Sequence, residues 1–507
     1  MTLKSVAVEV NSGLYAAVYP GSFQKEHRDV RDRRNFFFFV LFLFLSAMFG
    51  LVVSNNLLYM YTFWEITSVC SFLLIGYTES RVAVNNSFKA LWMNLLGGAA
   101  FAAAIIVMGL TYHSTALSHL VGLALAGMPV TVILALLLLC GFTKSAMMPF
   151  SGWLLGAMVA PTPTSALLHS STMVKAGVFL IIKLCPALGN NHAGTMAMFV
   201  GGITFFFASC AAISQSDGKK VLAYSTISNL GLIVCCAGIG SYEAAWTAIM
   251  IVIFHAVAKS LLFLSVGTAE QQLGSRDIER FDGLFNAMPH LCLCMVIGIS
   301  GMFLAPFGML ISKWAAMKAF IDAGHPMLLL LLVFGSATTI FYWAKWLGKI
   351  LSVMNGQERR EQGITQGEWF ALKTLSWMTI IVCILFPLIS SYGVLPYLRI
   401  TYGFTRDVIA QSNLIIMSLM VVLLVILPSR YGKGQPKRKV GALLAGVNTG
   451  DDRNYRGAGD NIIPVELRNW YMEEWFGEKK MKLSGFALCM ACIFIQFAII
   501  LGGVYRG

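Results

Sequence analysis

Charged side chains are scarce in this chain. Only 12% of its 507 residues are Asp, Glu, Lys or Arg, whereas 57% are hydrophobic. A soluble domain carries about 25% charged residues, so this composition excludes the soluble class. Runs of about 20 apolar residues recur from Phe36 almost to the C-terminus, and each can cross a bilayer as a helix. We therefore predict an all-α, polytopic protein of the cell inner (cytoplasmic) membrane.

Several functional classes lack their signatures here. No cleavable signal peptide is evident, because the first 34 residues are polar and mixed and end in EHRDVRDRR. Most of the eleven cysteines lie in apolar runs, and the one CxxC, Cys489 to Cys492, lies in the last predicted span. No Cys, His or carboxylate cluster has iron-sulfur or nickel spacing. We therefore expect no cofactor and no electron transfer in this chain.

The net charge of +13 does not indicate a nucleic-acid partner. Lys and Arg are spread over the loops between apolar runs, where the positive-inside bias of membrane proteins would place them. The lipid bilayer and other membrane subunits are the expected partners, and no nucleic acid is expected.

About thirteen transmembrane helices are predicted from the apolar runs and their polar interruptions. Two runs are too long and too interrupted for one straight helix. Residues 129–158 contain Gly141, Lys144 and Pro149, and residues 288–321 contain Gly301, Pro306 and Gly308. Both are predicted to be discontinuous helices.

The predicted organisation has six parts. The polar, Gly-rich loop before the last span makes that final helix an expected appendage to the bundle. The parts are an extramembrane N-terminal segment (1–35), a first half (36–215), a second half (216–350), additional transmembrane helices (351–428), an extramembrane loop (429–482) and a C-terminal transmembrane helix (483–507).

An internal repeat is visible when charges are aligned. FKALWMNLLG at 88–97 matches AKSLLFLSVG at 258–267, which pairs Lys89 with Lys259 at an offset of 170. Lys144 pairs with Lys313 at an offset of 169. The second lysine of each pair lies on a broken helix, as in transporters that are built from repeats.

Glu65 lies inside the apolar run YMYTFWEITSVCSFLLIGY. An ionised carboxylate at this depth is costly unless it is paired or hydrated. Lys144 and Lys89 are the cations available in the same half, and we expect Glu65 and Lys144 to form an acid–base couple that relays protons. Water could reach the unpaired backbone groups of the break beside Lys144.

Further ionisable residues in separate spans extend this predicted relay. A histidine can pass a proton between its two ring nitrogens, and buried lysines can exchange theirs. The alternative is that each residue only holds helices together, and for Lys345 that it extends toward the interface. The additional residues are His169, Lys175, Lys219, His255, Lys259, Lys313 and Lys345.

Four stretches resemble a known family: FWEITSVCSFLLIGY, the GFTKSAMMPFSGWLLGAMVAPTPTSALLHSSTMVKAGVFLI region, SDGKKVLAYSTISNLG and FHAVAKSLLFLSVG. They resemble the antiporter-like subunits of respiratory complex I, of multisubunit sodium/proton antiporters and of membrane-bound energy-converting [NiFe] hydrogenases. The resemblance covers residues 36–350. The C-terminal part is most similar to the hydrogenase-associated branch.

The resemblance implies roles for individual residues. Glu65 would be the glutamate of the first half-channel, Lys144 and Lys313 the lysines of the two broken helices, and His169 a bridge. Lys219 and Lys259 would belong to the central series. This chain departs from the pattern by having Ile251 where some relatives carry a second histidine, and by lacking several helices before Glu65, a face that a neighbouring subunit could cover.

The leading hypothesis is a proton-translocating subunit of a membrane-bound oxidoreductase complex of the hydrogenase or complex I type. Iron-sulfur clusters, and a NiFe site in some complexes, would then lie in partner subunits. The first alternative is a subunit of a multisubunit Na+/H+ antiporter, with Thr67 and Ser68 as hydroxyls near Glu65 for a sodium site. The second is a non-conducting membrane anchor. A solute carrier would instead need one polar cavity.

Overall fold

The computed structural model describes residues 32–304, 307–352, 360–403, 407–431, 447–449, 454–464 and 468–504. Most of the predicted N-terminal segment 1–35, parts of the loop 429–482 and Pro306 lie outside these residues. The described part is helical except for one small antiparallel sheet, which confirms the all-α class. Within it, eleven helices are long and apolar enough to cross a membrane, and two shorter apolar helices, Thr131–Lys144 and Gln411–Leu424, accompany them.

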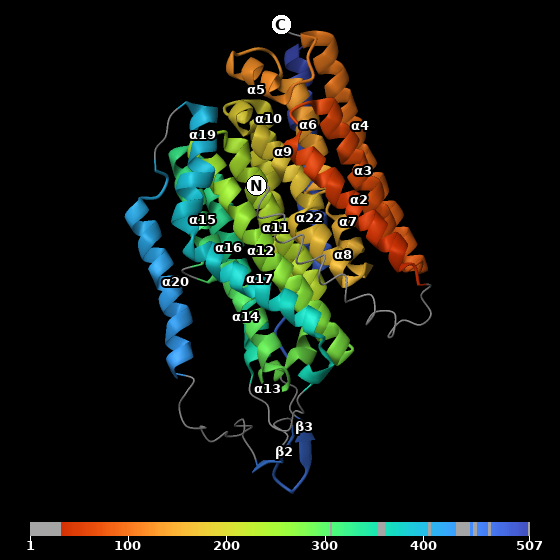
Figure 1. Cartoon of the computed structure of the whole chain (residues 1–507), viewed down its shortest axis with the longest axis vertical. Helices are drawn as coiled ribbons and strands as arrows, with labels where there is room; N and C mark the ends of the chain where they lie inside the picture. The colour runs from red at the N-terminus through yellow and green to blue at the C-terminus, as the bar shows by residue number, and fades with distance from the viewer. Residues whose placement is uncertain are drawn as a thin grey trace.

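The first half begins with three long helices that run alternately along the bundle (Figure 1). Its helices are α2 (Arg34–Val53), α3 (Leu57–Ile75), α4 (Arg81–Tyr112), the short α5 (Leu117–Leu125), α6 (Thr131–Lys144), α7 (Gly152–Gly156), η1 (Ala157–Val159), α8 (Thr162–Ala166), the π-helical turn η2 (Leu167–Ser171) and α9 (Met173–Leu188). The chain turns from α8 through η2 into α9, and together residues Thr162–Leu188 are long and apolar enough to form one membrane span.

The second half follows the same order of helices. Its elements are α10 (His192–Ile213), α11 (Gly218–Ile239), α12 (Tyr242–Leu273), η3 (Ile278–Phe281), α13 (Leu284–Ala287), α14 (Pro289–Phe303), α15 (Gly308–Asp322) and α16 (Pro326–Leu351). The order of the helices matches when the second half is counted from α10, whereas the sequence prediction began it at residue 216.

The two halves are an inverted repeat. Leu57 and Gly218, the first residues of α3 and α11, are 161 positions apart, as are Arg81 and Tyr242, the first residues of α4 and α12. Both of the last-named helices have 32 residues and a serine N-cap. The short connecting helices α5 and α13 lie at opposite ends of the bundle (Figure 1). This offset corrects the sequence alignment, because Lys89 now matches Met250 and not Lys259.

Both predicted helix breaks are present, but the two lysines lie on different sides of them. Lys144 is the last residue of α6, and the chain passes through Ala146 at a φ of 53° before α7 begins. Lys313 instead lies within α15, after the break that follows Phe303. Gly141 does not break α6, since a side chain there would meet Ile181 at 2.8 Å, so this glycine lets α6 and α9 pack closely.

The C-terminal part adds helices around the repeat. These elements are η4 (Glu361–Gly363), α17 (Gln366–Ile384), α18 (Phe386–Leu388), the π-helical turn η5 (Ile389–Val394), α19 (Leu395–Tyr402), α20 (Gln411–Tyr431), the strands β1 (Val447–Asn448), β2 (Asn454–Arg456) and β3 (Ile462–Pro464), α21 (Glu473–Phe476) and α22 (Glu478–Val504). The order in the sheet is β1-β2-β3, and Tyr455 is paired with Ile463.

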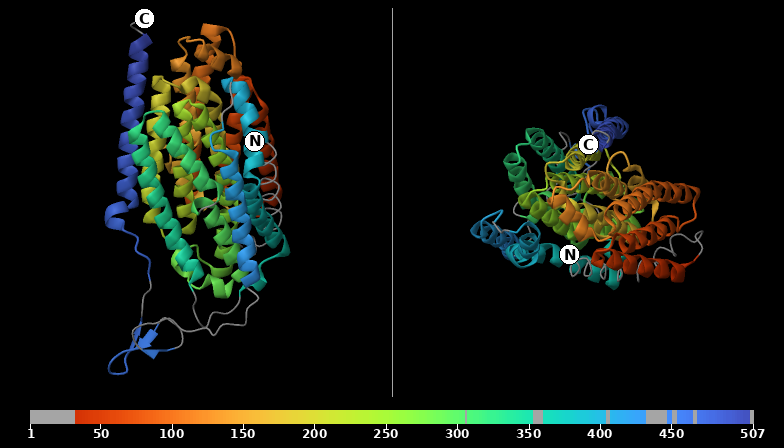
Figure 2. Two further views of the ribbon diagram at one scale, coloured as in Figure 1. Left: turned by 90° about the vertical axis from the view of Figure 1, so that its left-hand side faces the viewer. Right: turned by 90° about the horizontal axis from the view of Figure 1, so that it is seen from above.

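The last helix is not the appendage that the sequence suggested. Helix α22 runs beside the bundle for most of its height (Figure 2). Gly485 is so close to the break after Lys144 that a Cβ there would lie 2.3 Å from the Met148 sulfur. The same helix places Cys489 beside Thr204, whose hydroxyl accepts a hydrogen bond from the Met148 backbone amide. A chain segment far away in the sequence therefore packs against the broken helix.

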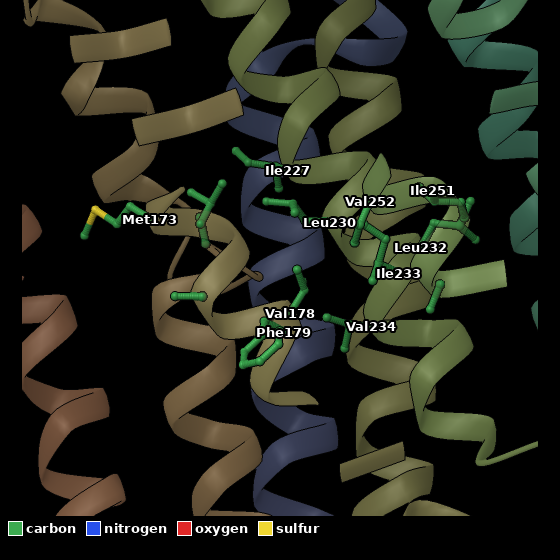
Figure 3. Close-up of a cluster of buried hydrophobic side chains, with 14 of the residues drawn as sticks. Met173, Val178, Phe179, Ile227, Leu230, Leu232, Ile233, Val234, Ile251 and Val252 are labelled. Carbon is green, nitrogen blue, oxygen red and sulfur yellow. The ribbon is translucent and has the colours of Figure 1, made fainter. Parts of the chain in front are cut away.

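The centre of the bundle is formed by α9, α11 and α12, whose apolar side chains interlock (Figure 3). Every residue of α11 except Lys220 is buried, so this helix has no lipid-facing side. Any ionisable group that points at α11 must therefore find its partners within the protein. The side chains in this cluster include Met173, Val178, Phe179, Ile227, Leu230, Leu232, Ile233, Val234, Ile251 and Val252.

Candidate functional site

Lys144 is fully buried and is bound by the helix that carries Glu65. Its Nζ donates hydrogen bonds to the Trp64 carbonyl oxygen at 3.1 Å and to Ser68 Oγ at 2.8 Å. The ammonium also lies 5.1 Å from the centre of the Trp64 ring. Oxygen acceptors and an aromatic face stabilise a cation that has no access to water. Ser68, which the sequence offered as a sodium ligand, here binds the lysine.

Glu65 occupies a space that a glycine provides. Its Oε1 is buried without a hydrogen-bond partner among the described residues, and it lies 2.1 Å from where a Cβ on Gly98 would be. None of the ion pairs within the described residues joins Glu65 to Lys144, although the two charges are close enough to interact. The predicted couple is therefore adjacent but not in contact.

His169 lies between the two halves on the π-helical turn η2. Its ring is fully buried, and neither ring nitrogen has a hydrogen-bond partner in the described part of the chain. The rings of Trp153 and Phe263 lie 6.3 Å and 6.1 Å away and come from the first and second halves. π-Helical turns frequently occur at functional sites. His169 is therefore a buried histidine without a hydrogen-bond partner among the described residues, between aromatic rings of the two halves.

Lys259 repeats the arrangement around Lys144. Its Nζ donates to the Leu222 carbonyl oxygen at 3.0 Å and to Ser225 Oγ, and it lies 5.0 Å from the centre of the Trp343 ring. In both places a serine hydroxyl donates back to the carbonyl oxygen that the lysine also uses, Ser68 to Trp64 and Ser225 to Leu222. We call each set of carbonyl, serine and aromatic ring a lysine cradle.

Lys175 and His255 lie near Lys259. Lys175 is 3% exposed, and its Nζ donates to the Val252 carbonyl oxygen at 3.1 Å, one turn before His255 on α12. The His255 ring is fully buried and has no hydrogen-bond partner among the described residues. Within the described residues, no ion pair joins a carboxylate to these three groups, so close packing of their charges is unfavourable. They can therefore share few protons at a time.

Lys219 and Lys345 lie at the end of the second half, near the connection after α12. Lys219 forms an ion pair of 2.6 Å with Glu270, which is one-third exposed. Lys345 donates to the carbonyl oxygens of Ile213 at 2.6 Å and Gln215 at 3.3 Å. Both lysines thus have their polar partners at this end of the bundle.

The remaining two predicted residues differ from the rest. Lys313 is 6% exposed, and its described contact is the Phe205 ring at 5.5 Å. Lys89 is exposed on α4, with its Nζ against Gly152. It is on the surface and does not reach Glu65, so it does not belong to the buried series. Lys349, four residues after Lys345, pairs with Glu279 and Asp282 at 2.8 Å and 2.9 Å.

Sequence reasoning missed the groups that hold the lysines. The groups that bind the lysines are uncharged, so the sequence does not distinguish them; they are Ser225, the rings of Trp64 and Trp343 and the backbone carbonyls. Gly98 resembles many other helix glycines. A serine one turn after a buried aromatic residue on an apolar helix is the one signal that could have indicated the cradle at Ser68. In the described residues, no group of three or more His, Cys, Asp or Glu could hold a metal ion. The arrangement is suited to moving protons.

Comparisons with known proteins show which family this chain is similar to. Residues 54–339 match the transmembrane family described as NADH:quinone oxidoreductase/Mrp antiporter. The Na(+)/H(+) antiporter subunit A1 of Staphylococcus aureus strain JH9 is 34% identical over 352 residues, which are 64% of this chain and 44% of that protein. The antiporter subunit mnhA2 of Staphylococcus epidermidis is 37% identical over 57% of this chain and 38% of its own length.

Two solved structures share the fold. One is the Mrp complex from Dietzia sp. DQ12-45-1b, with a TM-score of 0.67 and 29% identity over 78% of this chain and 45% of that chain. The other is the membrane-bound sulfane sulfur reductase, an archaeal respiratory membrane complex, with a TM-score of 0.63 and 23% identity over 76% and 77%. This chain spans less than half the length of the curated antiporter relatives given above.

Proposed function

This chain belongs to the NADH:quinone oxidoreductase/Mrp antiporter family of membrane subunits, and from that premise we propose that it translocates protons as one subunit of a larger ion-transporting complex. The observation that carries the proposal is the pair of lysine cradles. Lys144 and Lys259 are fully buried, and each is held by uncharged acceptors that do not fix its protonation state. A lysine bound in this way can be an ammonium ion or a neutral amine.

The proposed route uses the groups in their order along the chain. A proton on Lys144 passes through His169 to the group formed by Lys175, His255 and Lys259. Each step moves one proton from an ammonium or imidazolium to a neutral nitrogen, with water between groups that are not in contact. Glu65, held at Gly98, stabilises the charged form of Lys144 when it is ionised. Lys219 and Lys345 join this route to the surface.

The named relatives favour the multisubunit Na+/H+ antiporter over the oxidoreductase complex that led the sequence hypotheses. Two curated relatives above 30% identity are antiporter subunits, and the structure at 29% identity is an Mrp complex. The respiratory neighbour is 23% identical and supports the fold alone. We propose that the partners of this chain are other membrane subunits of such an antiporter, and that iron-sulfur or NiFe partners are not required.

The proton route can be tested by replacing Lys144 with methionine, which keeps its length and removes its charge. In inside-out vesicles that contain the assembled complex, we expect Lys144→Met to abolish the pH gradient formed on adding sodium. Lys318→Met is the matched control, because Lys318 is half-exposed on α15 and pairs with Asp322. Normal transport by an assembled Lys144→Met complex would contradict the proposal and favour a structural role for the lysine.

The choice between the two complexes needs a separate measurement. We expect purification in mild detergent to recover membrane antiporter subunits and no iron or nickel. Recovery of iron-sulfur subunits in constant proportion would support the oxidoreductase complex instead.

A further inference from the structure

The segment before α22 returns to one end of the bundle and covers it. Tyr471, just before α21, is only 6% exposed. Its hydroxyl donates a hydrogen bond to Glu279 Oε1, and the Asn469 backbone amide donates to the same oxygen at 3.2 Å. Arg468 lies 5.5 Å from the centre of the Tyr471 ring. Two separate contacts therefore fix this segment on Glu279.

Lys345 lies directly beneath the Tyr471 ring. Its Nζ is 4.0 Å from the ring centre, and on its other side it donates to the carbonyl oxygens of Ile213 and Gln215 at the end of α10. Gln215 is only 6% exposed. The tyrosine ring thus covers the Lys345 ammonium, which also binds the Gln215 carbonyl oxygen.

Glu279 is an anion at this position. Burial raises the pKa of its carboxyl group, but hydrogen bonds from Lys349 and Tyr471 outweigh burial and lower the pKa below its ordinary value. Burial, with the neighbouring Glu279, raises the pKa of the Tyr471 phenol, so this hydroxyl remains a donor. Lys349 binds the other carboxylate oxygen at 2.8 Å.

Helix α11 extends from this end of the bundle to the buried Lys259. The amide of Gly218 donates to the carbonyl oxygen of Arg276, three residues before Glu279, and Lys219 is the next residue on α11. Lys219 pairs with Glu270. Leu222, one turn further along α11, supplies the carbonyl oxygen that binds Lys259. Helix α11 therefore carries Lys219 at this end of the bundle and, one turn deeper, the carbonyl oxygen that binds Lys259.

This end of the bundle faces the cytoplasm by the positive-inside rule. Arg34, Arg81, Lys219, Arg276 and Arg360 lie at or near helix ends on this side, which also carries α13 and the strands (Figure 1). At the other end, residues 54–56, 113–130, 189–191, 240–241 and 323–325 contain no Lys or Arg, whereas the connection 403–410 after α19 contains Arg406.

We propose that Lys345, Gln215 and Glu279 form the cytoplasmic mouth of the second half, with Glu279 as the carboxylate that exchanges protons with water and Tyr471 as its cover. This rests on the proposed proton-translocating function. At the mouth, the Glu279 carboxylate takes a proton from water and becomes the neutral acid. When it passes that proton inward to a neutral amine, it returns to the carboxylate. Tyr471 is a positioning residue, because it orients Glu279 and shields Lys345.

Thiol labelling tests the cover independently of transport. Gln215→Cys is introduced into the full chain and treated with a charged, membrane-impermeant thiol reagent in inside-out vesicles, where the cytoplasmic side faces outward. The unsubstituted chain measures the background, because its cysteines are buried except Cys492, which is intermediate. We expect slow labelling that rises by an order of magnitude when Tyr471→Ala is added. Tyr455→Ala, on β2, is the control and should change nothing.

Two results would overturn the proposal from labelling alone. One is equal labelling of Gln215→Cys with and without Tyr471→Ala. The other is labelling only in right-side-out vesicles, which would place this end on the opposite side of the membrane.

Transport separates the mouth from the proposed function. We expect Glu279→Gln to lower proton transport severely and Tyr471→Phe, which keeps the ring but loses the hydroxyl, to lower it less. Glu474→Gln, an exposed neighbour on α21, should have no effect. Unchanged transport by an assembled Glu279→Gln complex, in the same preparation where Lys144→Met has none, would overturn the mouth and leave the proposed function intact. Normal transport by Lys144→Met would refute the function itself.

Discussion

The two halves of the bundle place their charges on opposite members of the same helix pair. The offset of 161 residues that matches α3 to α11 and α4 to α12 also matches Glu65 to Thr226 and Gly98 to Lys259. In the first half the first helix supplies the charge and its partner supplies a glycine. In the second half the first helix supplies small hydroxyl residues and its partner supplies the lysine. One helix contact thus holds an acid in one half and a base in the other.

This difference explains where each half keeps its carboxylates. In the first half Glu65 lies inside the membrane-spanning part, beside Lys144. In the second half Glu270 and Glu279 lie near and after the end of α12, where they pair with Lys219 and Lys349. The breaks differ in the same sense, since Lys144 ends the helix before its break and Lys313 lies in the helix after its break. An inverted repeat with identical charges would look the same from both sides of the membrane. The different charges of the two halves make the two sides of this bundle distinct.

Removing Glu65 should have the largest effect on transport, because it is the carboxylate that lies inside the membrane-spanning part beside Lys144. We expect Glu65→Gln to lower proton transport by about a hundredfold, the contribution of a positioned proton-transfer group. Transport in inside-out vesicles is the measurement. Glu79→Gln is the matched control, since Glu79 is exposed and pairs with Arg33 outside α3. Equal transport in Glu65→Gln and wild type would mean that the acid and glycine pair has no role in transport.

Filling the space beside Glu65 should have the next largest effect. A Cβ on Gly98 would meet Glu65 Oε1 at 2.1 Å, so Gly98→Ala displaces the carboxylate and its helix at a cost of about 2 kcal/mol. We expect a lower thermal midpoint in detergent and transport between that of wild type and Glu65→Gln.

Gly109→Ala is the control for that substitution on the same helix. Nothing lies within 4 Å of a Cβ there, and alanine is favoured over glycine inside a helix by about 0.5–1 kcal/mol. Gly109→Ala should therefore be as stable as wild type or more so. If Gly98→Ala and Gly109→Ala have the same thermal midpoint and the same transport, the Glu65 carboxylate does not need the space beside Gly98.

The sequence was sufficient for the fold where composition or backbone chemistry dictates the outcome. Apolar runs predicted the spans, and Pro149 predicted the break after Lys144. The charge-based alignment gave the wrong register, because the two halves differ in their charges, whereas their helix lengths and the Ser80 and Ser241 caps agree. The packing of α22 was not predictable, since Gly485 and Met148 meet through shape alone.

The site was predictable in its ionisable residues but not in their partners. Burying Glu65, Lys144 or His255 is so costly that each stands out in an apolar run. Their acceptors are backbone carbonyls and serine hydroxyls, which occur in every helix and become specific only when helices pack. Lys89 shows the opposite failure, because a lysine inside a predicted span can still lie on the exposed face of its helix.

Removing one serine from each cradle asks whether the cradles are equivalent. We expect Ser68→Ala and Ser225→Ala each to lower transport by about fivefold, because a buried hydrogen bond contributes about 1 kcal/mol. Ser46→Ala is the control, since the exposed Ser46 hydroxyl bonds only to the Phe42 carbonyl on its own helix. A loss in Ser68→Ala without a loss in Ser225→Ala would show that Lys144 depends on its cradle and Lys259 does not.

The smallest expected effect concerns the acids at the end of the second half. The pKa of Glu279 is lower in the folded protein than its ordinary value of 4.5, so its stabilising contribution is complete above that value and is lost as the pH falls through the lower, folded pKa. We expect less than about 1 kcal/mol, because partly exposed ion pairs contribute little. Thermal midpoints in detergent between neutral pH and about pH 4 should therefore fall more for wild type than for Glu279→Gln. Glu474→Gln should follow wild type. Parallel profiles for wild type and Glu279→Gln would mean that Lys349 and Tyr471 do not stabilise this carboxylate, and the second half would then lack the acid that corresponds in function to Glu65.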